Sequence, residues 1–295
     1  MKNIALFLLG LILFTSQFSC NTEDKKTKSA VTEKIRIANN GVNIDYTETG
    51  KADTVLLFVH GWGINRSYWA DQEKYFSGRF RVVAIDLPGF GQSGKNRNDW
   101  SVEAYGKDVN AVIDQLKLNN VILIGHSMAG DIVAEAAVND SIHIIGLVGI
   151  DNFKTVGYKL TKEDKEGFAK ALAEMKVNFT EVITGYFNRS LFSPSTDSSV
   201  RKRVLYDVTH SDSVIAVAAM EVDEYDEAGK LAAAKKKLYL INSDVTPTDT
   251  AGFVKNNIPY KIEYIHGTGH YPMIEKTAEF NAAMDKIIAT ILKKE

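Results

Sequence analysis

The sequence predicts an α/β fold: a mostly parallel, twisted sheet of about eight strands, flanked by helices. Two observations carry this prediction. Short apolar runs alternate with segments of helical periodicity, and one long segment, residues 152–235, contains helical patterns only. Such alternation requires crossover connections, which produce parallel sheets covered on both faces. We therefore expect a core formed by residues 34–151 and 236–295, with residues 152–235 inserted as a helical cap after the sixth strand.

The N-terminal segment, residues 1–20, has a different composition from the rest of the chain. A positive start, Met1-Lys2-Asn3, precedes an apolar run from Ile4 to Phe14, and Cys20 is the only cysteine of the 295 residues. A short apolar run with such flanks is typical of a secretory signal and too short to span a bilayer comfortably. A single cysteine has no partner within the chain, so no internal disulfide is expected.

The position of Cys20 makes the segment similar to a bacterial lipoprotein signal. The resemblance implies that Cys20 is lipidated and becomes the first residue of a membrane-anchored lipoprotein on the periplasmic or cell-surface face. Gln17 departs from the usual motif, which prefers Leu three residues before the cysteine. A soluble secreted or periplasmic protein and an uncleaved anchor remain alternatives. Residues 21–33 lack apolar periodicity and are interpreted as a flexible tether.

The predicted strands follow in order along the chain. Residues 34–38 and 42–50 show period-two apolar patterns around an Asn-Asn-Gly turn, which indicates a hairpin. Continuous apolar runs typical of buried parallel strands follow, at residues 54–61, 81–89, 120–127, 144–151, 236–244 and 260–267. Helical spacing is found between and after them, at about residues 65–76, 102–116, 129–138 and 274–292. In the segment 152–235, a helix is expected to begin at Thr161, because Thr is a good N-cap and acidic residues follow it.

Ser127 is the main candidate for a catalytic nucleophile. It follows an apolar strand and precedes a helical pattern, within the sequence Gly125-His126-Ser127-Met128-Ala129. This strand–turn–helix setting is what a nucleophile elbow requires, although the usual motif ends in Gly rather than Ala. His126 and Asp86 are interpreted as structural, and Asp131 as a solvated residue on the helix face.

Four motifs in one order make residues 34–293 resemble the α/β-hydrolase superfamily. They are HGWG at 60–63, DLPGFGQS at 86–93, GHSMAG at 125–130 and GTGHYPMIE at 267–275. The resemblance implies that the backbone N–H groups of Trp62 and Met128 form an oxyanion hole. It also implies that His270 is the general base, whereas His60 braces its loop.

Two carboxylates compete for the role of the acid that orients His270. Asp244 follows the strand at 238–242 and matches the usual family position, whereas Asp151 follows the strand at 144–150, where some members place the acid. Asp244 is preferred and Asp151 is the alternative. The correct residue is expected within about 2.6–3.2 Å of Nδ1 of His270.

These residues predict a serine hydrolase that cleaves a small or medium carboxylic ester through an acyl-enzyme. Lactone opening and C–C bond hydrolysis are enzymatic alternatives, and a non-catalytic ligand- or partner-binding protein of the same fold is a third. The histidines lack metal-ligand spacing, so no metal and no cofactor are expected. The net charge of −2 gives no reason to expect nucleic acid as a partner. Apolar cap residues are candidates for an acyl pocket, although most are expected to pack the cap onto the sheet: Phe168, Leu172, Phe179, Phe187 and Phe192.

Overall fold

The computed structural model describes residues 35–221 and 225–293. The predicted signal at residues 1–20, the lipidation site Cys20 and the tether at 21–33 lie outside the described residues. Among the residues described, no helix has both the length and the apolar character that a membrane crossing requires.

The core is a seven-stranded sheet in the order β3-β5-β4-β6-β7-β8-β9. All neighbours in it are parallel except β3, which runs antiparallel to β5 at one edge. Its strands are β3 Tyr46–Thr49, β4 Val55–Val59, β5 Arg81–Ile85, β6 Val121–His126, β7 Ile144–Ile150, β8 Leu238–Ser243 and β9 Tyr260–Ile265. The predicted fold class is thereby confirmed.

The N-terminal hairpin forms a separate two-stranded sheet, β1 Ile37–Asn39 and β2 Val42–Ile44. The strand predicted over residues 42–50 is divided at Asp45 into β2 and β3. Both backbone groups of Asp45 bond outside a strand ladder, because its N–H donates to Oγ of Ser93 at 2.8 Å and its carbonyl accepts the N–H of Asp86 at 2.8 Å. Because β1 and β2 form their own sheet, the main sheet has seven strands rather than about eight. The long helical segment follows β7.

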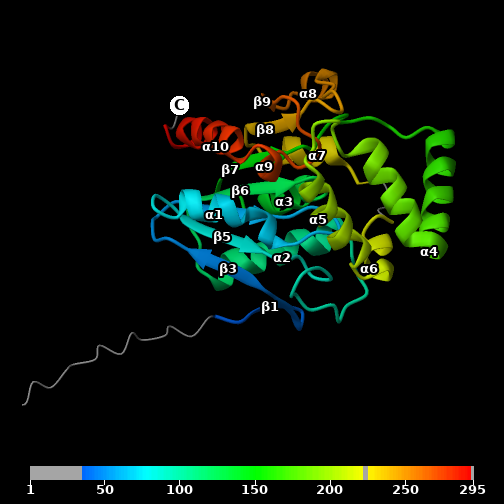
Figure 1. Cartoon of the computed structure of the whole chain (residues 1–295). Helices are drawn as coiled ribbons and strands as arrows, with labels where there is room; N and C mark the ends of the chain where they lie inside the picture. Colours follow the sequence, from blue (N-terminus) through cyan, green and yellow to red (C-terminus); the bar gives the residue numbers. More distant parts are fainter. Residues whose placement is uncertain (1–34, 222–224, 294–295) are drawn as a thin grey trace, which may run out of the picture. The chain divides into compact units, whose positions relative to one another are not determined.

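The two faces of the sheet are covered by different helices (Figure 1). One apolar core unites the sheet with α1 Ala70–Phe76 and α10 Thr277–Leu292 through Phe76, Phe280 and Met284. The other unites it with α2 Val102–Gln115 and α3 Ala129–Asn139 through Val109, Ile132 and further buried residues. Three short helices complete the core: η1 Arg66–Trp69, α8 Ala251–Lys255 and α9 Pro272–Glu275. Strands β4, β6 and β7 lie between both layers, which explains why their sequences are apolar without alternation.

The described residues between β7 and β8 form helices and no strand. These helices are α4 Lys162–Ser190, α5 Ser198–Thr209, α6 Ser213–Ala218 and α7 Glu227–Ala233. Thr161 is the N-cap of α4, as predicted, and with Asp164 it forms a capping box. A non-helical Asn178 kinks the helix. In Figure 1, α4, α5 and α6 lie beyond the carboxyl ends of the parallel strands, on the side away from the arrowhead of the antiparallel β3. This is the edge at which ligands bind in open parallel sheets.

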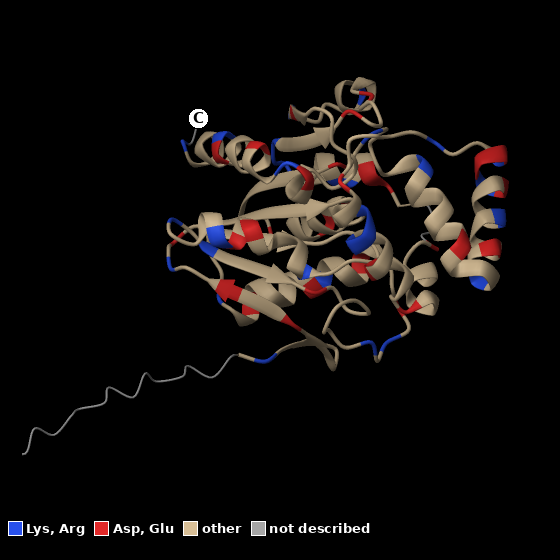
Figure 2. Ribbon diagram, viewed as in Figure 1, with Lys and Arg blue, Asp and Glu red and all other residues tan. Residues whose placement is uncertain are grey.

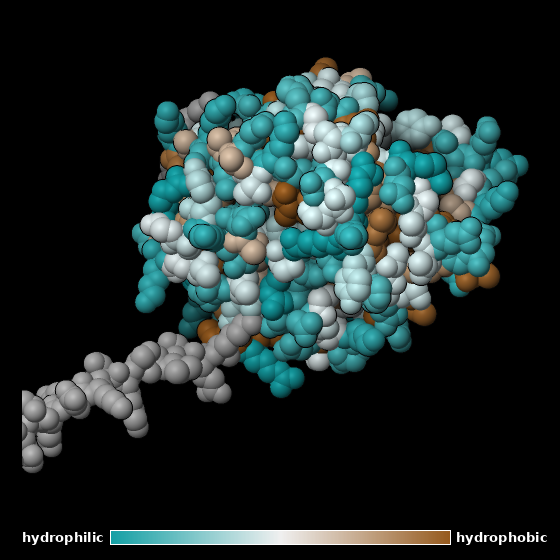
Figure 3. All heavy atoms as spheres, in the orientation of Figure 1, coloured by the Kyte–Doolittle hydropathy of each residue, from teal (hydrophilic) through white to brown (hydrophobic). Residues whose placement is uncertain are grey.

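Charges of both signs are mixed over the described part of the chain (Figure 2). The face shown in Figure 3 is largely hydrophilic, with small and separate hydrophobic patches. In Figure 2 the Lys and Arg residues do not form a continuous basic stripe of the kind that binds a phosphate backbone.

Candidate active site

Ser127 occupies a strained turn between β6 and α3. Its φ of +54° lies in the left-handed region, which a non-glycine residue rarely adopts. The turn is held by three hydrogen bonds: Ser127 N–H donates to the carbonyl of Ile150 at 2.9 Å, and the carbonyl of Ser127 accepts Gly130 N–H at 2.9 Å and Nδ2 of Asn152 at 3.3 Å. A partly exposed serine held in this conformation is what a nucleophile elbow requires.

Small residues make this turn possible because other backbone comes very close. A Cβ atom on Gly125 would lie 2.3 Å from the carbonyl oxygen of Ala129. A Cβ on Gly61, in the HGWG loop, would lie 2.6 Å from Nδ1 of His126 and 3.0 Å from Cβ of Ser127. The HGWG loop therefore packs directly against the elbow, as the sequence motifs imply.

His270 follows β9 and is fixed by backbone and side-chain contacts. Its N–H donates to the carbonyl of Leu191 at 2.7 Å, and its own carbonyl accepts a hydrogen bond from Nε2 of His126 at 2.8 Å. Its Nδ1 lies 2.6 Å from Oδ2 of Asp151. This bond places the proton on Nδ1 and leaves Nε2 free to accept a proton.

Asp151 is buried at the end of β7, with a positive φ of +46°. While Oδ2 faces His270, Oδ1 accepts hydrogen bonds from the N–H of Ser243 at 2.7 Å and its hydroxyl at 2.8 Å, and Nζ of Lys154 lies 2.8 Å away. Burial acts to raise the pKa of Asp151, but the hydrogen bond from His270 and the charges of His270 and Lys154 outweigh it. The pKa of Asp151 therefore lies well below its usual value, and the group is a carboxylate at neutral pH.

The structure contradicts the expected hydrogen bond between Asp244 and His270. Asp244 is exposed in the loop after β8, where it accepts hydrogen bonds from His266 at 3.1 Å and from Gly267 N–H at 3.1 Å. The last residue of β8, Ser243, instead holds Asp151 toward His270, and Asp244 follows it in the exposed loop. The alternative residue, Asp151, therefore meets the distance that the sequence analysis set for the acid.

The predicted oxyanion donors lie on either side of the elbow. Met128 directly precedes α3, and Trp62 lies in the HGWG loop that contacts Ser127. Within residues 35–221 and 225–293, neither backbone N–H donates to a protein acceptor. The Trp62 side chain is anchored, because its Nε1 donates to the carbonyl of Ala216 in α6 at 2.7 Å. Two free N–H groups beside a serine suit the binding of an oxyanion.

The structural roles predicted for His60, Asp86 and His126 are confirmed. Nε2 of His60 accepts the N–H of Leu87 at 2.9 Å, and its Nδ1 donates to the carbonyl of Gly61 at 2.8 Å. Asp86 is buried and holds Arg66 through the backbone N–H and the guanidinium. Burial, together with the charge of His270, lowers the pKa of His126 to about 3, so that His126 is neutral at pH 7.

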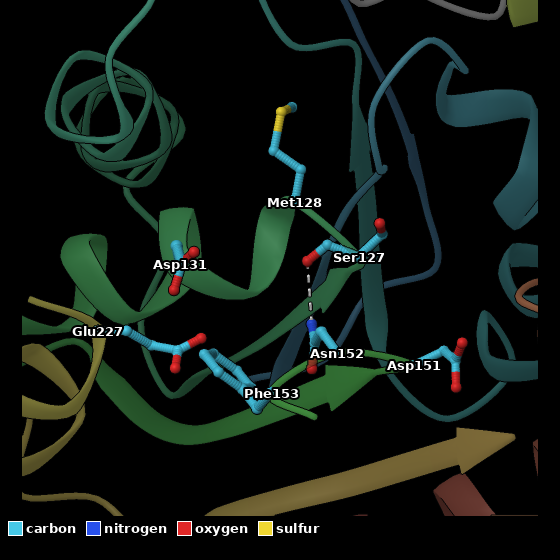
Figure 4. A pocket seen from close by; sticks show the side chains of 7 residues that line it. All are labelled: Ser127, Met128, Asp131, Asp151, Asn152, Phe153 and Glu227. Atoms are coloured by element: carbon cyan, nitrogen blue, oxygen red, sulfur yellow. Dashed lines mark hydrogen bonds between the residues drawn. The ribbon is translucent and has the colours of Figure 1, made fainter. Parts of the chain in front are cut away.

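A cavity of about 250 Å³ opens beside Ser127 (Figure 4). It is lined by Ser127, Met128, Asp131, Asp151, Asn152, Phe153 and Glu227. None of the cap residues proposed for an acyl pocket is among them: Phe187 and Phe192 are buried in the packing between cap and sheet, and Phe168 is 40% exposed. The cavity is consequently more polar than the sequence suggested.

Sequence reasoning missed Asn152 and Glu227 and misjudged Asp131. Asn152 stabilises the elbow, since its Nδ2 donates hydrogen bonds to the carbonyl of Gly125 at 2.9 Å and to the carbonyl of Ser127 at 3.3 Å. Its place directly after Asp151 was the available signal. Asp131 is not a solvated residue of the helix face, because it lines the cavity and its Oδ1 is buried. Glu227 enters from α7, far away in the sequence, and no local pattern marks it.

Comparison with known proteins identifies the fold family. A bifunctional esterase/perhydrolase of Acinetobacter calcoaceticus is 36% identical over 97 residues, covering 32% of this chain and 35% of that protein. A thermophilic esterase from Thermogutta terrifontis superimposes with a TM-score of 0.74 at 20% identity, covering 87% of this chain and 98% of the other. The enol-lactonase from Burkholderia xenovorans LB400 gives a TM-score of 0.72 at 18% identity, covering 88% and 100%. The family model for the alpha/beta hydrolase fold matches residues 54–248, and with the strand order and the elbow described above it shows that the chain belongs to the α/β-hydrolase family.

Proposed function

We propose that the protein is a serine hydrolase that cleaves small or medium carboxylic esters through an acyl-enzyme. The observation that carries the proposal is the hydrogen bond of 2.6 Å between buried Asp151 and partly buried His270, at the same edge of the sheet as the strained Ser127. Ser127 and Asp151 also line one cavity. The relative described as an esterase/perhydrolase supports the choice of an ester as the substrate.

The mechanism follows from these positions. His270 Nε2 takes the proton of the Ser127 hydroxyl as the Ser127 oxygen attacks the ester carbonyl, and Asp151 stabilises the resulting imidazolium. The backbone N–H groups of Trp62 and Met128 bind the oxyanion. His270 then returns the proton to the departing alcohol, and the acyl-enzyme remains. A water molecule, deprotonated by His270, attacks the acyl carbonyl, and the acid leaves as Ser127 regains its proton.

Lactone opening is the second candidate, and the structural likeness to an enol-lactonase favours keeping it. The same residues would act, but the alcohol would stay attached to the acyl group. C–C bond hydrolysis requires a further proton transfer to carbon, a step that the mechanism above does not contain. Comparing kcat/KM for a linear ester and for a lactone of the same carbon number distinguishes the first two candidates.

The test of the proposed function is a series of p-nitrophenyl esters from acetate to long acyl chains. The protein is the chain without residues 1–20, and Ser127→Ala is the control. The cavity of about 250 Å³ predicts an optimum at short chains. Activity that survives in Ser127→Ala would contradict the assignment of Ser127. No turnover of any ester or lactone by the folded protein, together with no labelling by a serine-directed reagent, would favour the non-catalytic binding protein.

We also propose, from the sequence of residues 1–20 alone, that the protein is exported and lipidated at Cys20. Metabolic labelling with a fatty-acid analogue in a bacterial host tests this proposal. The wild-type chain is expected to take up label and partition with membranes, whereas Cys20→Ser is expected to do neither. Equal labelling of both chains would overturn it.

A further inference from the structure

Two carboxyl groups of the cavity have no part in the proposed mechanism. Asp131 lies in the first turn of α3, one turn after Ser127, and Glu227 is the first residue of α7. Figure 4 shows the Glu227 side chain reaching from α7 toward Phe153 and the turn of α3 that carries Asp131. Both side chains line the same cavity as Ser127 and Met128.

Among the described residues, no cation is available to balance a negative charge on this pair. No Lys or Arg is among the residues that line the cavity. The nearby cations are bound to other carboxylates, since Lys230 contacts Glu135 at 2.6 Å and Lys154 contacts Asp151 at 2.8 Å. The hydroxyl of Tyr225 donates to the backbone carbonyl of Asp131 and to the carboxylate of Glu135, each at 3.2 Å, and not to the Asp131 carboxyl group.

The Asp131 side chain also lacks a hydrogen-bond donor. Its Oδ1 is buried and has no partner among the described residues. A buried carboxyl oxygen without a donor is costly, and such atoms in native structures usually have a ligand or a functional reason. Oδ1 itself is shielded from water, but the Asp131 side chain lines the cavity beside the nucleophile, so a donor for this carboxyl group is expected to arrive with the substrate.

The pair holds protons more tightly than isolated carboxyls do. Burial raises the pKa of Asp131 to about 7, and burial followed by the charge of Asp131 raises that of Glu227 to about 8. Two neighbouring carboxyls without a cation share protons, because the second ionisation is opposed by the first charge. A bound cation would remove this opposition, and the pair would release protons as the cation binds.

We propose that Asp131 and Glu227 bind a protonated amine of the substrate, so that the enzyme prefers esters with an ammonium group a few atoms from the carbonyl. This inference rests on the proposed ester hydrolysis and names the substrate class of that same site. An ammonium ion supplies up to three N–H donors, which suits two carboxyl groups, one of which has an unpartnered oxygen. The cavity of about 250 Å³ restricts the amine to a small one.

The kinetic test compares isosteric esters that differ in charge, using the full chain in detergent. β-Alanine ethyl ester and ethyl butyrate place the charge in the acyl part, whereas 3-(dimethylamino)propyl acetate and 4-methylpentyl acetate place it in the alcohol part. We expect kcat/KM for the ammonium ester to exceed that of its neutral isostere at least tenfold in one pair. In the double variant Asp131→Asn/Glu227→Gln, the ratio of kcat/KM for the ammonium ester to kcat/KM for the neutral ester should fall to about one.

The control is Asp140→Asn, which removes a carboxylate at the end of the same helix, where it contacts His143 outside the cavity. It should keep the wild-type preference. A wild-type preference for the neutral ester in both pairs, or a preference for the ammonium ester that the double variant retains, would overturn the proposal.

A binding measurement separates this inference from the proposed function. Ser127→Ala is titrated with butylammonium and with 1-butanol by calorimetry at pH 8. We expect butylammonium to bind at least tenfold more tightly, with proton release, and this difference to vanish when Asp131→Asn and Glu227→Gln are added. If the amine binds in this way but no ester is cleaved, the proposed function fails and the amine site stands. If esters are cleaved but butanol binds as well as the amine, the amine site fails and the hydrolase stands.

Discussion

The exchange Asp151→Asn tests the electrostatic centre of the account. In the native protein, Oδ2 of Asp151 accepts the proton on Nδ1 of His270, and Oδ1 is held by Ser243 and Lys154. An asparagine retains the size and can keep its oxygen toward Ser243 and Lys154. Its amide nitrogen then faces His270, where it donates rather than accepts. The proton of His270 is thereby moved to Nε2, the atom that must accept the proton of Ser127.

The structure gives the size of the effect. At the observed 2.6 Å and an effective dielectric constant of about 20, the attraction between the carboxylate and an imidazolium is about 6 kcal/mol. At 1.36 kcal/mol per factor of ten, its full loss corresponds to about four factors of ten in rate. Contacts that asparagine preserves reduce this figure, so we expect kcat to fall about 10³- to 10⁴-fold, in line with the loss of the same interaction in other serine hydrolases.

The assay is hydrolysis of the best p-nitrophenyl ester by the wild-type chain, Asp151→Asn and the matched control Asp244→Asn. Asp244 is exposed and contacts His266, so its exchange should change kcat less than threefold. Thermal unfolding shows whether each variant is folded. A loss of a hundredfold or more in Asp244→Asn, with near-normal activity in folded Asp151→Asn, would refute the reasoning and restore Asp244 as the acid.

Three further predictions concern the elbow, the cavity and acid stability. Gly125→Ala places a Cβ 2.3 Å from the carbonyl oxygen of Ala129, so its free energy of unfolding, measured by chemical denaturation, should fall by about 1–3 kcal/mol or more. The control Gly167→Ala has open space around the new Cβ and should lose no stability. Asn152→Ala removes the donor to the carbonyls of Gly125 and Ser127, so the free energy of unfolding should fall by about 1–3 kcal/mol. We also expect a lower kcat with little change in KM, and an unchanged kcat would contradict the positioning role of Asn152. The raised pKa of Asp131, about 7, means that the folded state keeps a proton which the unfolded chain releases above about pH 4. The wild-type protein therefore loses stability as the pH rises toward 7, and Asp131→Asn should be more stable relative to the wild-type protein at pH 8 than at pH 5; a difference independent of pH would count against the burial of this carboxyl.

The parts of the fold that depend on local pattern could be predicted from the sequence. The apolar runs at 54–61, 120–127 and 144–151 correspond to β4, β6 and β7, because strands buried on both faces must be apolar throughout. The division of residues 42–50 could not be predicted, since it depends on two hydrogen bonds to residues more than 40 positions away: Asp45 N–H donates to Ser93, and Asp86 N–H donates to Asp45.

The candidate site divides in the same way. Ser127 and His270 stand at strand ends within recognisable motifs, and the structure places both at the expected edge of the sheet. The choice between Asp151 and Asp244 depends on tertiary contacts, since both residues follow parallel strands but only Asp151 reaches His270, whereas Asp244 binds His266 and Gly267. The cavity depends on α7 bringing Glu227 into the same lining as Asp131, 96 positions away in the sequence, which no local pattern encodes.

Labelling of Ser127 by a fluorophosphonate, followed by intact mass measurement, tests the central claim most directly. The reagent requires an activated serine but no particular substrate, so the result does not depend on knowing the natural ester. The account predicts a single adduct on the wild-type protein, which peptide mapping places on Ser127, no adduct on Ser127→Ala, and much slower labelling of His270→Ala. A folded wild-type protein that stays unlabelled, or Ser127→Ala labelled as fast as the wild type, would contradict it.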